Sequence, residues 1–321
     1  LVLKRFIPLG SVSGYLNTRT SKSMYLPVLQ KKNHRMRQIH VTAFLFLCAL
    51  TAYLSDVSGF TPDKKVVYKT VGTTELKLHI FAPPGHEPSD KRSAIVFFFG
   101  GGWNGGSPGQ FYPHCKYLAS RGMVAMSAEY RVKRKNKTSP RECVKDGKSA
   151  IRWIRQHAKN LGIDPDKIAA GGGSAGGHVA AATGTTKAFN EEGEDQDVSC
   201  IPNALVLFNP VFDNGPGGYG HSRVKEYWKE FSPMHNISEK TPPTVVFLGT
   251  KDKLIPVETG EQYKKRMVDK GLRCDLYLSK DQGHGFFNFK NKENYTKTVI
   301  EMDRFLESLG YLEGKPTLQN K

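Results

Sequence analysis

The 321-residue sequence contains only five cysteines, and none of them lies in a spacing that binds a metal. It has no CxxC pair and no cluster of cysteine and histidine, so we expect neither a structural zinc nor another metal site. Zinc-finger motifs and aromatic RNA-binding strands are also missing. A nucleic-acid partner is therefore not expected, although the formal net charge is +17.

The excess of basic residues is spread unevenly along the chain. Residues 1–60 contain eight Lys or Arg and one acidic residue, Asp56. The remainder carries 39 basic and 29 acidic side chains, a net charge of +10. Its densest basic run is RVKRKNK at 131–137, which we interpret as a solvated loop.

No apolar run is clearly long enough to span a membrane. The run VTAFLFLCALTAYL at 41–54 follows a short basic start at Met36 and Arg37 and precedes small residues near Gly59. This order is typical of a secretory signal peptide. We expect 36–59 to be that signal, 1–35 to be a non-native or upstream-translated extension, and the protein to be exported, periplasmic or secreted, without stable membrane association after cleavage. The alternative is an uncleaved N-terminal membrane anchor.

Cleavage would remove Cys48 and leave an even number of cysteines. These are Cys115, Cys143, Cys200 and Cys274. An exported protein allows disulfides between them, but their wide spacing leaves the pairing open.

From about residue 64 onward, strand-like and helix-like segments alternate. We expect strands at 75–83, 94–99, 123–130, 166–172, 204–210, 244–250 and 274–280, and helices at 139–162, 257–271 and 294–309. This alternation predicts an α/β fold, a mostly parallel sheet with helices on both faces. One catalytic domain is expected over 64–311, with a lid-like or substrate-facing insertion at 213–236 and a polar tail at 312–321.

The stretch GGGSAGGH at 171–178 places one serine, Ser174, among glycines. It follows an apolar strand, precedes a helix-prone segment and fits the pattern G-x-S-x-G. In that pattern the serine sits on a sharp strand-to-helix turn as a nucleophile. A phosphate-binding loop would need a Gly-Lys-Ser/Thr sequence next, which is absent.

A serine nucleophile needs a base, and three histidines follow it at a distance. His284 lies in the Gly-flanked loop DQGHG, just after the last expected strand. His221 and His235 lie inside the irregular insertion, which makes them poorer candidates. We therefore predict that His284 is the base.

Two aspartates compete for the acid that orients this histidine. Asp252 follows the buried strand TVVFLGT, and Asp281 lies three residues before His284. The acid must reach the imidazole Nδ1 from a neighbouring strand's loop, which favours Asp252. Asp281 is expected to act as a local turn residue.

The segment FFFGGGWNGGS at 97–107 predicts a site for the oxyanion. Its triple glycine allows backbone N–H groups to approach a bound carbonyl closely. Ala175, directly after the nucleophile, would supply another N–H.

In the order FGGGW, GGGSAGGH and GTKDKLIP…GHGFF, these motifs resemble the α/β-hydrolase superfamily over residues 64–311. Within it the chain is similar to the esterase/lipase group related to hormone-sensitive lipase and to bacterial feruloyl and acetyl-xylan esterases. The resemblance implies the α/β-hydrolase fold, a serine mechanism without a cofactor, the triad Ser174, Asp252 and His284, and the oxyanion donors Gly101, Gly102 and Ala175.

One residue departs from the family pattern. The family usually has histidine before the triple glycine, where this chain has Phe99. The pocket itself is expected to use the aromatic residues Trp103, Tyr112 and Tyr219, for which ordinary packing is the alternative.

The expected activity is hydrolysis of short-chain carboxylic esters, with a small ester or an acetylated or feruloylated polysaccharide as substrate. An arylformamidase or other C–N hydrolase and a peptidase of the prolyl-oligopeptidase type remain alternatives. A non-catalytic binding module is a further alternative, although such modules usually lack a triad member. The oligomeric state stays open.

Overall fold

A computed structural model describes residues 59–319 of the chain. The expected extension and almost all of the expected signal peptide, residues 1–58, lie outside the described residues, so the expectations about them stay predictions.

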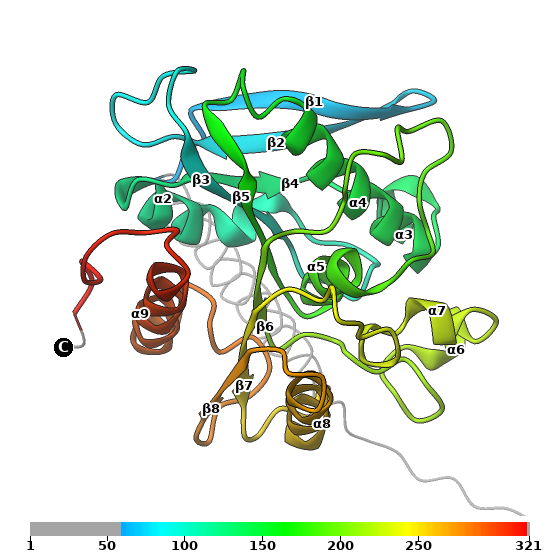
Figure 1. Cartoon of the computed structure of the whole chain (residues 1–321). Helices are drawn as coiled ribbons and strands as arrows, with labels where there is room; N and C mark the ends of the chain where they lie inside the picture. Colours follow the sequence, from blue (N-terminus) through cyan, green and yellow to red (C-terminus); the bar gives the residue numbers. More distant parts are fainter. Residues whose placement is uncertain (1–58, 320–321) are drawn as a thin grey trace, which may run out of the picture. The chain divides into compact units, whose positions relative to one another are not determined.

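The described residues form one eight-stranded sheet in the order β1-β2-β4-β3-β5-β6-β7-β8 (Figure 1). Its strands are β1 (Lys64–Val71), β2 (Thr74–Phe81), β3 (Arg92–Phe98), β4 (Val124–Ala128), β5 (Ile163–Gly173), β6 (Ala204–Phe208), β7 (Thr244–Gly249) and β8 (Cys274–Ser279). The β1–β2 and β2–β4 pairs are antiparallel, and every other pair is parallel. The predicted mostly parallel sheet is therefore confirmed.

Helices cover both faces of this sheet. They are α2 (Tyr112–Ser120), α3 (Lys133–Asn136), α4 (Pro140–Gln156), α5 (Ala175–Thr185), α6 (His221–Val224), α7 (Trp228–Phe231), α8 (Val257–Val268) and α9 (Lys292–Ser308), with the 3₁₀ turns η1 (Pro108–Phe111) and η2 (Pro233–His235).

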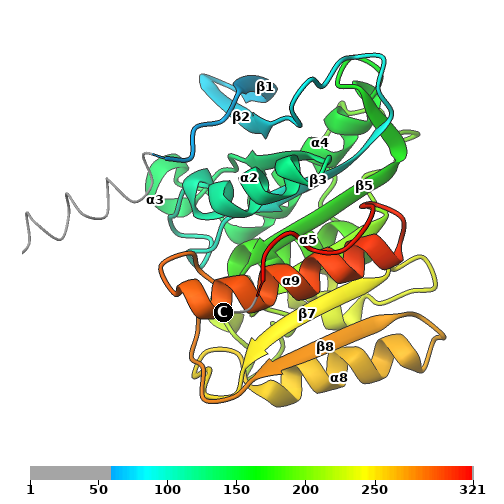
Figure 2. The ribbon, with the colours of Figure 1, turned by 90° about the vertical axis from the view of Figure 1, so that its left-hand side faces the viewer.

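Alternate residues of the central strands supply the two hydrophobic cores. Val96 and Phe98 of β3 pack with buried residues of α4, α5 and α8, whereas Ile95 and Phe97 pack with those of α2 and α9. Figure 2 shows α2 and α9 in front of the sheet. The nearly continuous apolar runs of β3 and β6 follow from this burial on both faces.

β1 is not among the strands that the sequence predicted, because its lysines obscure which of its residues are buried. Lys69 is only 9% exposed. Its Nζ lies 2.7 Å from the Asp146 carboxylate and 2.6 Å from that of Glu191. These ion pairs allow a charged residue to lie within the protein.

Two boundaries also differ from the prediction. The helix expected at 139–162 ends at Gln156, and β5 begins at Ile163 after a turn that closes on Gly162, whose φ is +61°. The first residues of the expected polar tail, 312–314, pack against the domain. Leu312 is buried, and the carbonyls of Glu313 and Gly314 accept hydrogen bonds from Arg121.

The four cysteines in the described part of the chain are buried and free, so none of the disulfides that the sequence allowed forms there. Within residues 59–319, no helix combines the length and the hydropathy that a membrane span requires.

Candidate active site

Ser174 lies at the junction of β5 and α5 in a conformation that few serines adopt. Its φ is 54° and its ψ is −120°. Such a backbone is strained for a residue with a side chain and persists only where the surroundings hold it. Here the Ser174 N–H donates to the Phe208 carbonyl at 2.9 Å, and its carbonyl accepts from His178 N at 2.9 Å. The turn therefore holds Ser174 in place at the N-terminus of α5.

The glycines around Ser174 are required by close backbone contacts. A Cβ on Gly172 would lie 2.5 Å from the Gly176 carbonyl group, and one on Gly176 would lie 2.0 Å from the Phe98 oxygen. Neither position can hold a larger residue unless the strand or the helix moves. The small neighbours are thus what lets the β5–α5 turn pack against β3.

The structure brings Ser174, His284 and Asp252 together in one hydrogen-bonded chain. The Ser174 Oγ lies 2.9 Å from His284 Nε2, and His284 Nδ1 lies 2.7 Å from Asp252 Oδ2. Asp252 follows β7 and His284 follows β8, and these two strands are neighbours. The carboxyl ends of adjacent parallel strands therefore present both side chains at one edge of the sheet.

Asp252 is held as a carboxylate. Its side chain is fully buried, and its Oδ1 accepts from the N–H groups of Leu254 and Ile255 at 2.8 and 3.0 Å. Burial alone would raise the pKa of Asp252, but the hydrogen bonds from His284 and these two amides outweigh it and lower that pKa. The charge faces His284 Nδ1.

Asp281 lies outside this chain of hydrogen bonds. Its carboxylate is exposed and lies 2.9 Å from Lys251 Nζ, and its N–H donates to Thr250 Oγ1 at 2.7 Å. Its φ of 59° fits the turn role that the sequence suggested.

Asn209 was missed by the sequence analysis. It directly follows β6, is fully buried, and its Oδ1 accepts from Gly285 N at 3.0 Å. Its Nδ2 lies 3.4 Å from His284 Nε2. Asn209 thus ties the histidine loop to the sheet. The available signal was a polar residue at the end of a buried parallel strand, in NP after ALVLF.

The triple-glycine loop turns tightly beside Ser174. Gly101 and Gly102 have φ values of 128° and 62°, and the Gly101 carbonyl accepts from Asn104 N at 3.0 Å. The N–H groups of Gly101, Gly102 and Ala175 donate to no acceptor within residues 59–319. They remain available to a ligand, and the α5 N-terminus adds its positive end.

Gly100 differs from its neighbours because its N–H is already used. It donates to Gln110 Oε1 at 2.6 Å, and Gln110 Nε2 donates to Asn288 Oδ1 at 2.9 Å. Asn288 in turn donates to the Gly285 carbonyl at 2.7 Å. This chain of amides connects the glycine loop with the loop that carries His284.

Phe99, at the position where the family usually has histidine, packs against an aromatic neighbour. Its ring stacks on Tyr130 with centroids 4.2 Å apart, and the Tyr130 hydroxyl donates to the Phe99 carbonyl at 2.5 Å. A Cβ on Gly106 would lie 2.5 Å from this ring. An aromatic pair therefore supports the loop at this position.

A pocket of about 370 Å³ opens over Ser174 and His284. Its lining mixes polar side chains with glycines and apolar side chains and comprises Gly100, Gly101, Gly102, Asn104, Gln110, Ser174, Asn209, Tyr219, Arg223, Leu254, His284, Gly285, Phe287 and Asn288. Tyr219 and Arg223 come from the insertion 213–236, which therefore faces the site.

Two of the three expected pocket aromatics lie elsewhere. Trp103 is 2% exposed and packs edge-on against His178 and Phe231, so it lies behind the lining. Tyr112 begins α2, where its hydroxyl hydrogen-bonds His79 Nδ1, and it is not a lining residue. Both rings pack against neighbouring residues, and neither lines this pocket.

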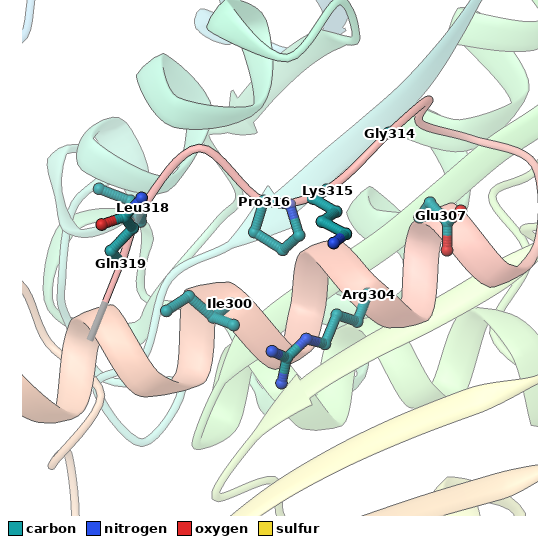
Figure 3. A pocket seen from close by; sticks show the side chains of 8 residues that line it. All are labelled: Ile300, Arg304, Glu307, Gly314, Lys315, Pro316, Leu318 and Gln319. Carbon is teal, nitrogen blue, oxygen red and sulfur yellow. The ribbon is translucent and has the colours of Figure 1, made fainter.

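A larger hollow of about 690 Å³ lies between α9 and the C-terminal segment (Figure 3). Ile300, Arg304 and Glu307 of α9 face the chain around Lys315 and Leu318. None of its lining residues belongs to the triad. No group of three or more His, Cys, Asp or Glu in residues 59–319 has the geometry of a metal site.

Comparisons with known proteins identify relatives that are named esterases. The family model described as BD-FAE matches residues 78–207. Esterase LipC of Mycobacterium tuberculosis is 29% identical over 220 residues, which are 62% of this chain and 54% of LipC. An acetylxylan esterase of Xylanibacter ruminicola is 28% identical over 264 residues, which are 78% of this chain and 50% of that protein. The chain thus spans about half the length of these two curated relatives.

Two solved structures have a higher sequence identity to this chain than these two curated relatives have. Thermogutta terrifontis esterase 2, phosphorylated by paraoxon, is 46% identical with a TM-score of 0.75. The match covers 78% of this chain and 96% of that chain. The same esterase with butyrate bound is 45% identical, also with a TM-score of 0.75 and with 78% and 96% covered.

Proposed function

Because the chain belongs to the α/β-hydrolase family of esterases, we propose that it is a serine carboxylesterase that cleaves short-chain esters through an acyl-enzyme. One observation carries the proposal: Ser174 Oγ, His284 and the Asp252 carboxylate form a continuous hydrogen-bonded chain on a strained β5–α5 turn. A serine becomes a strong nucleophile when a base takes its proton and an acid holds that base in the correct tautomer.

In the first half of the reaction, His284 Nε2 accepts the Ser174 proton while Oγ attacks the ester carbonyl. Asp252 accepts the Nδ1–H hydrogen bond throughout and stabilises the imidazolium that forms. His284 then donates the proton to the leaving alcohol, and the acyl group stays on Ser174.

The negative charge that develops on the carbonyl oxygen is stabilised by the N–H groups of Gly101, Gly102 and Ala175. Such preorganised donors are worth about 10²–10³ in rate each. In the second half, His284 activates a water molecule, which attacks the acyl group and releases the acid. No cofactor takes part in these steps.

The pocket favours small acyl groups and polar alcohols. About 370 Å³ leaves little room for a long chain, and the insertion presents no broad apolar face. Of the four amide side chains in the lining, those of Gln110, Asn209 and Asn288 already hydrogen-bond other residues of the site, which leaves that of Asn104 to hydrogen-bond a hydroxyl group of the substrate. We take an acetylated or feruloylated polysaccharide as the candidate natural substrate, and one relative is named an acetylxylan esterase.

A panel of substrates tests the proposal. The purified protein is assayed with p-nitrophenyl acetate, butyrate and laurate, with acetylated xylan, with N-formylkynurenine and with a proline-containing peptide amide. Turnover of the short esters with little turnover of the amides supports the esterase. Preferential cleavage of N-formylkynurenine would favour the arylformamidase, and cleavage of the peptide a peptidase.

Export is a separate part of the proposal and rests on the segment 36–59 alone. The N-terminal residue of the protein recovered outside the cytoplasm, determined by mass spectrometry, tests it. An intact 36–59 segment on that protein would contradict cleavage.

A further inference from the structure

Arg223 of α6 reaches into the pocket from the insertion. Its Nη1 donates to the Gly102 carbonyl at 2.6 Å. Its guanidinium lies over the rings of Trp103 and Tyr219, 4.9 and 5.2 Å from their centroids. A Cβ on Gly220 would lie 2.8 Å from Nη2, so the glycine at this position leaves room for the guanidinium. The side chain is thus ordered by contacts on several sides, although it is exposed to solvent.

This guanidinium has no carboxylate partner within residues 59–319. One of its five N–H donors is used by Gly102. Among the described residues, Arg223 is the only Lys or Arg that lines the pocket, and no Asp or Glu lines it. An ordered, unpaired guanidinium in a pocket without acidic side chains is suited to a carboxylate on the ligand.

The basic run 131–137 adds positive charge beside the same loop. The N–H groups of Lys133 and Arg134 donate to the carbonyls of Trp103 and Asn104 at 3.1 and 2.9 Å. A Cβ on Gly105 would lie 3.8 Å from Arg134 Cδ. Lys133, Arg134, Lys135 and Lys137 are exposed, and none forms an ion pair with a described residue. The run that the sequence suggested to be a solvated loop is therefore fastened to the glycine loop of the site.

The geometry points to a substrate class: esters that carry a carboxylate within reach of Arg223, with the basic run attracting acidic substrates toward the pocket. This inference rests on the proposed esterase function and adds a specificity-determining residue to it. The carboxylate can belong to the alcohol, as in a sugar acid, or to the acyl group, as in a half-ester of a diacid. In both cases a carboxylate faces the guanidinium of Arg223.

Matched substrate pairs separate these two sources. The alcohol side is tested with 4-acetoxybenzoate against 4-acetoxybenzamide, and the acyl side with monomethyl succinate against methyl butyrate. For each pair the ratio of kcat/KM, anionic over neutral, is measured for the wild type, Arg223→Gln, Arg223→Lys and Lys225→Gln. Lys225 is the matched control, because it is a nearby exposed cation that does not line the pocket.

For at least one pair, Arg223→Gln should lower the ratio by about tenfold, the size of a charge-assisted hydrogen bond. Arg223→Lys should lower it less, and Lys225→Gln should leave it close to that of the wild type. Added salt should also lower the wild-type ratio. Loss of the Gly102 contact alone would reduce both members of a pair equally and leave the ratio unchanged.

An unchanged ratio in both pairs, with the neutral esters still hydrolysed, overturns the inference and leaves the esterase intact. Failure of the wild type to hydrolyse any of the four esters overturns the proposed function instead.

Discussion

Asp252→Asn should cripple the enzyme for a reason that its hydrogen bonds make specific. The Asp252 Oδ1 accepts from two backbone N–H groups, those of Leu254 and Ile255. An asparagine must keep its carbonyl oxygen there, since a rotated amide would point its own N–H groups at these donors. Its NH₂ group then faces His284 Nδ1, where the carboxylate oxygen lies 2.7 Å away in the wild type.

That orientation forces His284 into the wrong tautomer. Nδ1 becomes the hydrogen-bond acceptor, the proton moves to Nε2, and Nε2 no longer accepts from Ser174. In Ser-His-Asp enzymes the same exchange lowers kcat by about 10⁴-fold, which corresponds to about 5 kcal/mol in the barrier. We expect a loss of this size on p-nitrophenyl butyrate, with a thermal midpoint close to that of the wild type.

Asp281→Asn is the control. Asp281 makes an exposed ion pair with Lys251 and has a φ of 59°, a conformation that asparagine tolerates well. Exposed ion pairs contribute at most about 1 kcal/mol to stability, and Asp281 contacts no member of the triad, so kcat should stay close to that of the wild type. If Asp281→Asn loses activity and Asp252→Asn keeps it, the acid is misassigned and the reasoning fails.

Three further predictions concern the pocket, the glycine loop and the core. Activity on p-nitrophenyl esters should peak at acetate or butyrate, and a peak at laurate would show a binding site for long chains outside the pocket of about 370 Å³. Gly101→Ala should lower kcat by about 10²-fold or more, because its Cβ would lie 2.2 Å from the Gly105 oxygen and displace the glycine loop. Gly105→Ala is the control and should change kcat little, because its Cβ would lie 3.8 Å from the nearest atom. Equal losses would refute that account. Burial lowers the pKa of His114 to about 3, so the unfolded chain binds an extra proton below about pH 6.5 and stability falls as pH drops from there toward 3. His114→Leu should lower the slope of the unfolding free energy against pH by the amount that corresponds to about one bound proton. Urea titrations between about pH 4 and about pH 7 measure this slope. A slope equal to that of the wild type would contradict the prediction.

Much of the fold could be predicted because the central strands are buried on both faces. Runs such as AIVFFF and ALVLF are typical of strands in a parallel sheet, and the helices between them are periodic. The expected membership of the α/β-hydrolase esterases is confirmed. β1 was missed because Lys69 carries its charge into the interior, and only the distant carboxylates of Asp146 and Glu191 make that possible.

Motif order likewise anticipated which three side chains meet at the site. Asp252 and His284 follow strands that proved to be neighbours, and Ser174 lies on the expected turn. Residues that support the site through tertiary contacts could not be found in this way. Asn209 and Arg223 act through partners 75 and 121 positions away in the sequence. The place of Asn209 at the end of a buried strand is a local signal, but it does not show which loop the side chain holds, and no local pattern marks Arg223.

The most direct test of the central claim is the mass of the Ser174 peptide after treatment with paraoxon. An activated serine attacks the phosphorus, releases p-nitrophenolate and keeps the diethylphosphoryl group. Trypsin yields the peptide 168–187, which contains Ser174 as its only serine. We predict that this peptide alone gains one diethylphosphoryl group in step with the loss of esterase activity, and that Ser174→Ala shows neither labelling nor turnover. Labelling at another residue, or hydrolysis by Ser174→Ala at a rate near that of the wild type, would contradict the account.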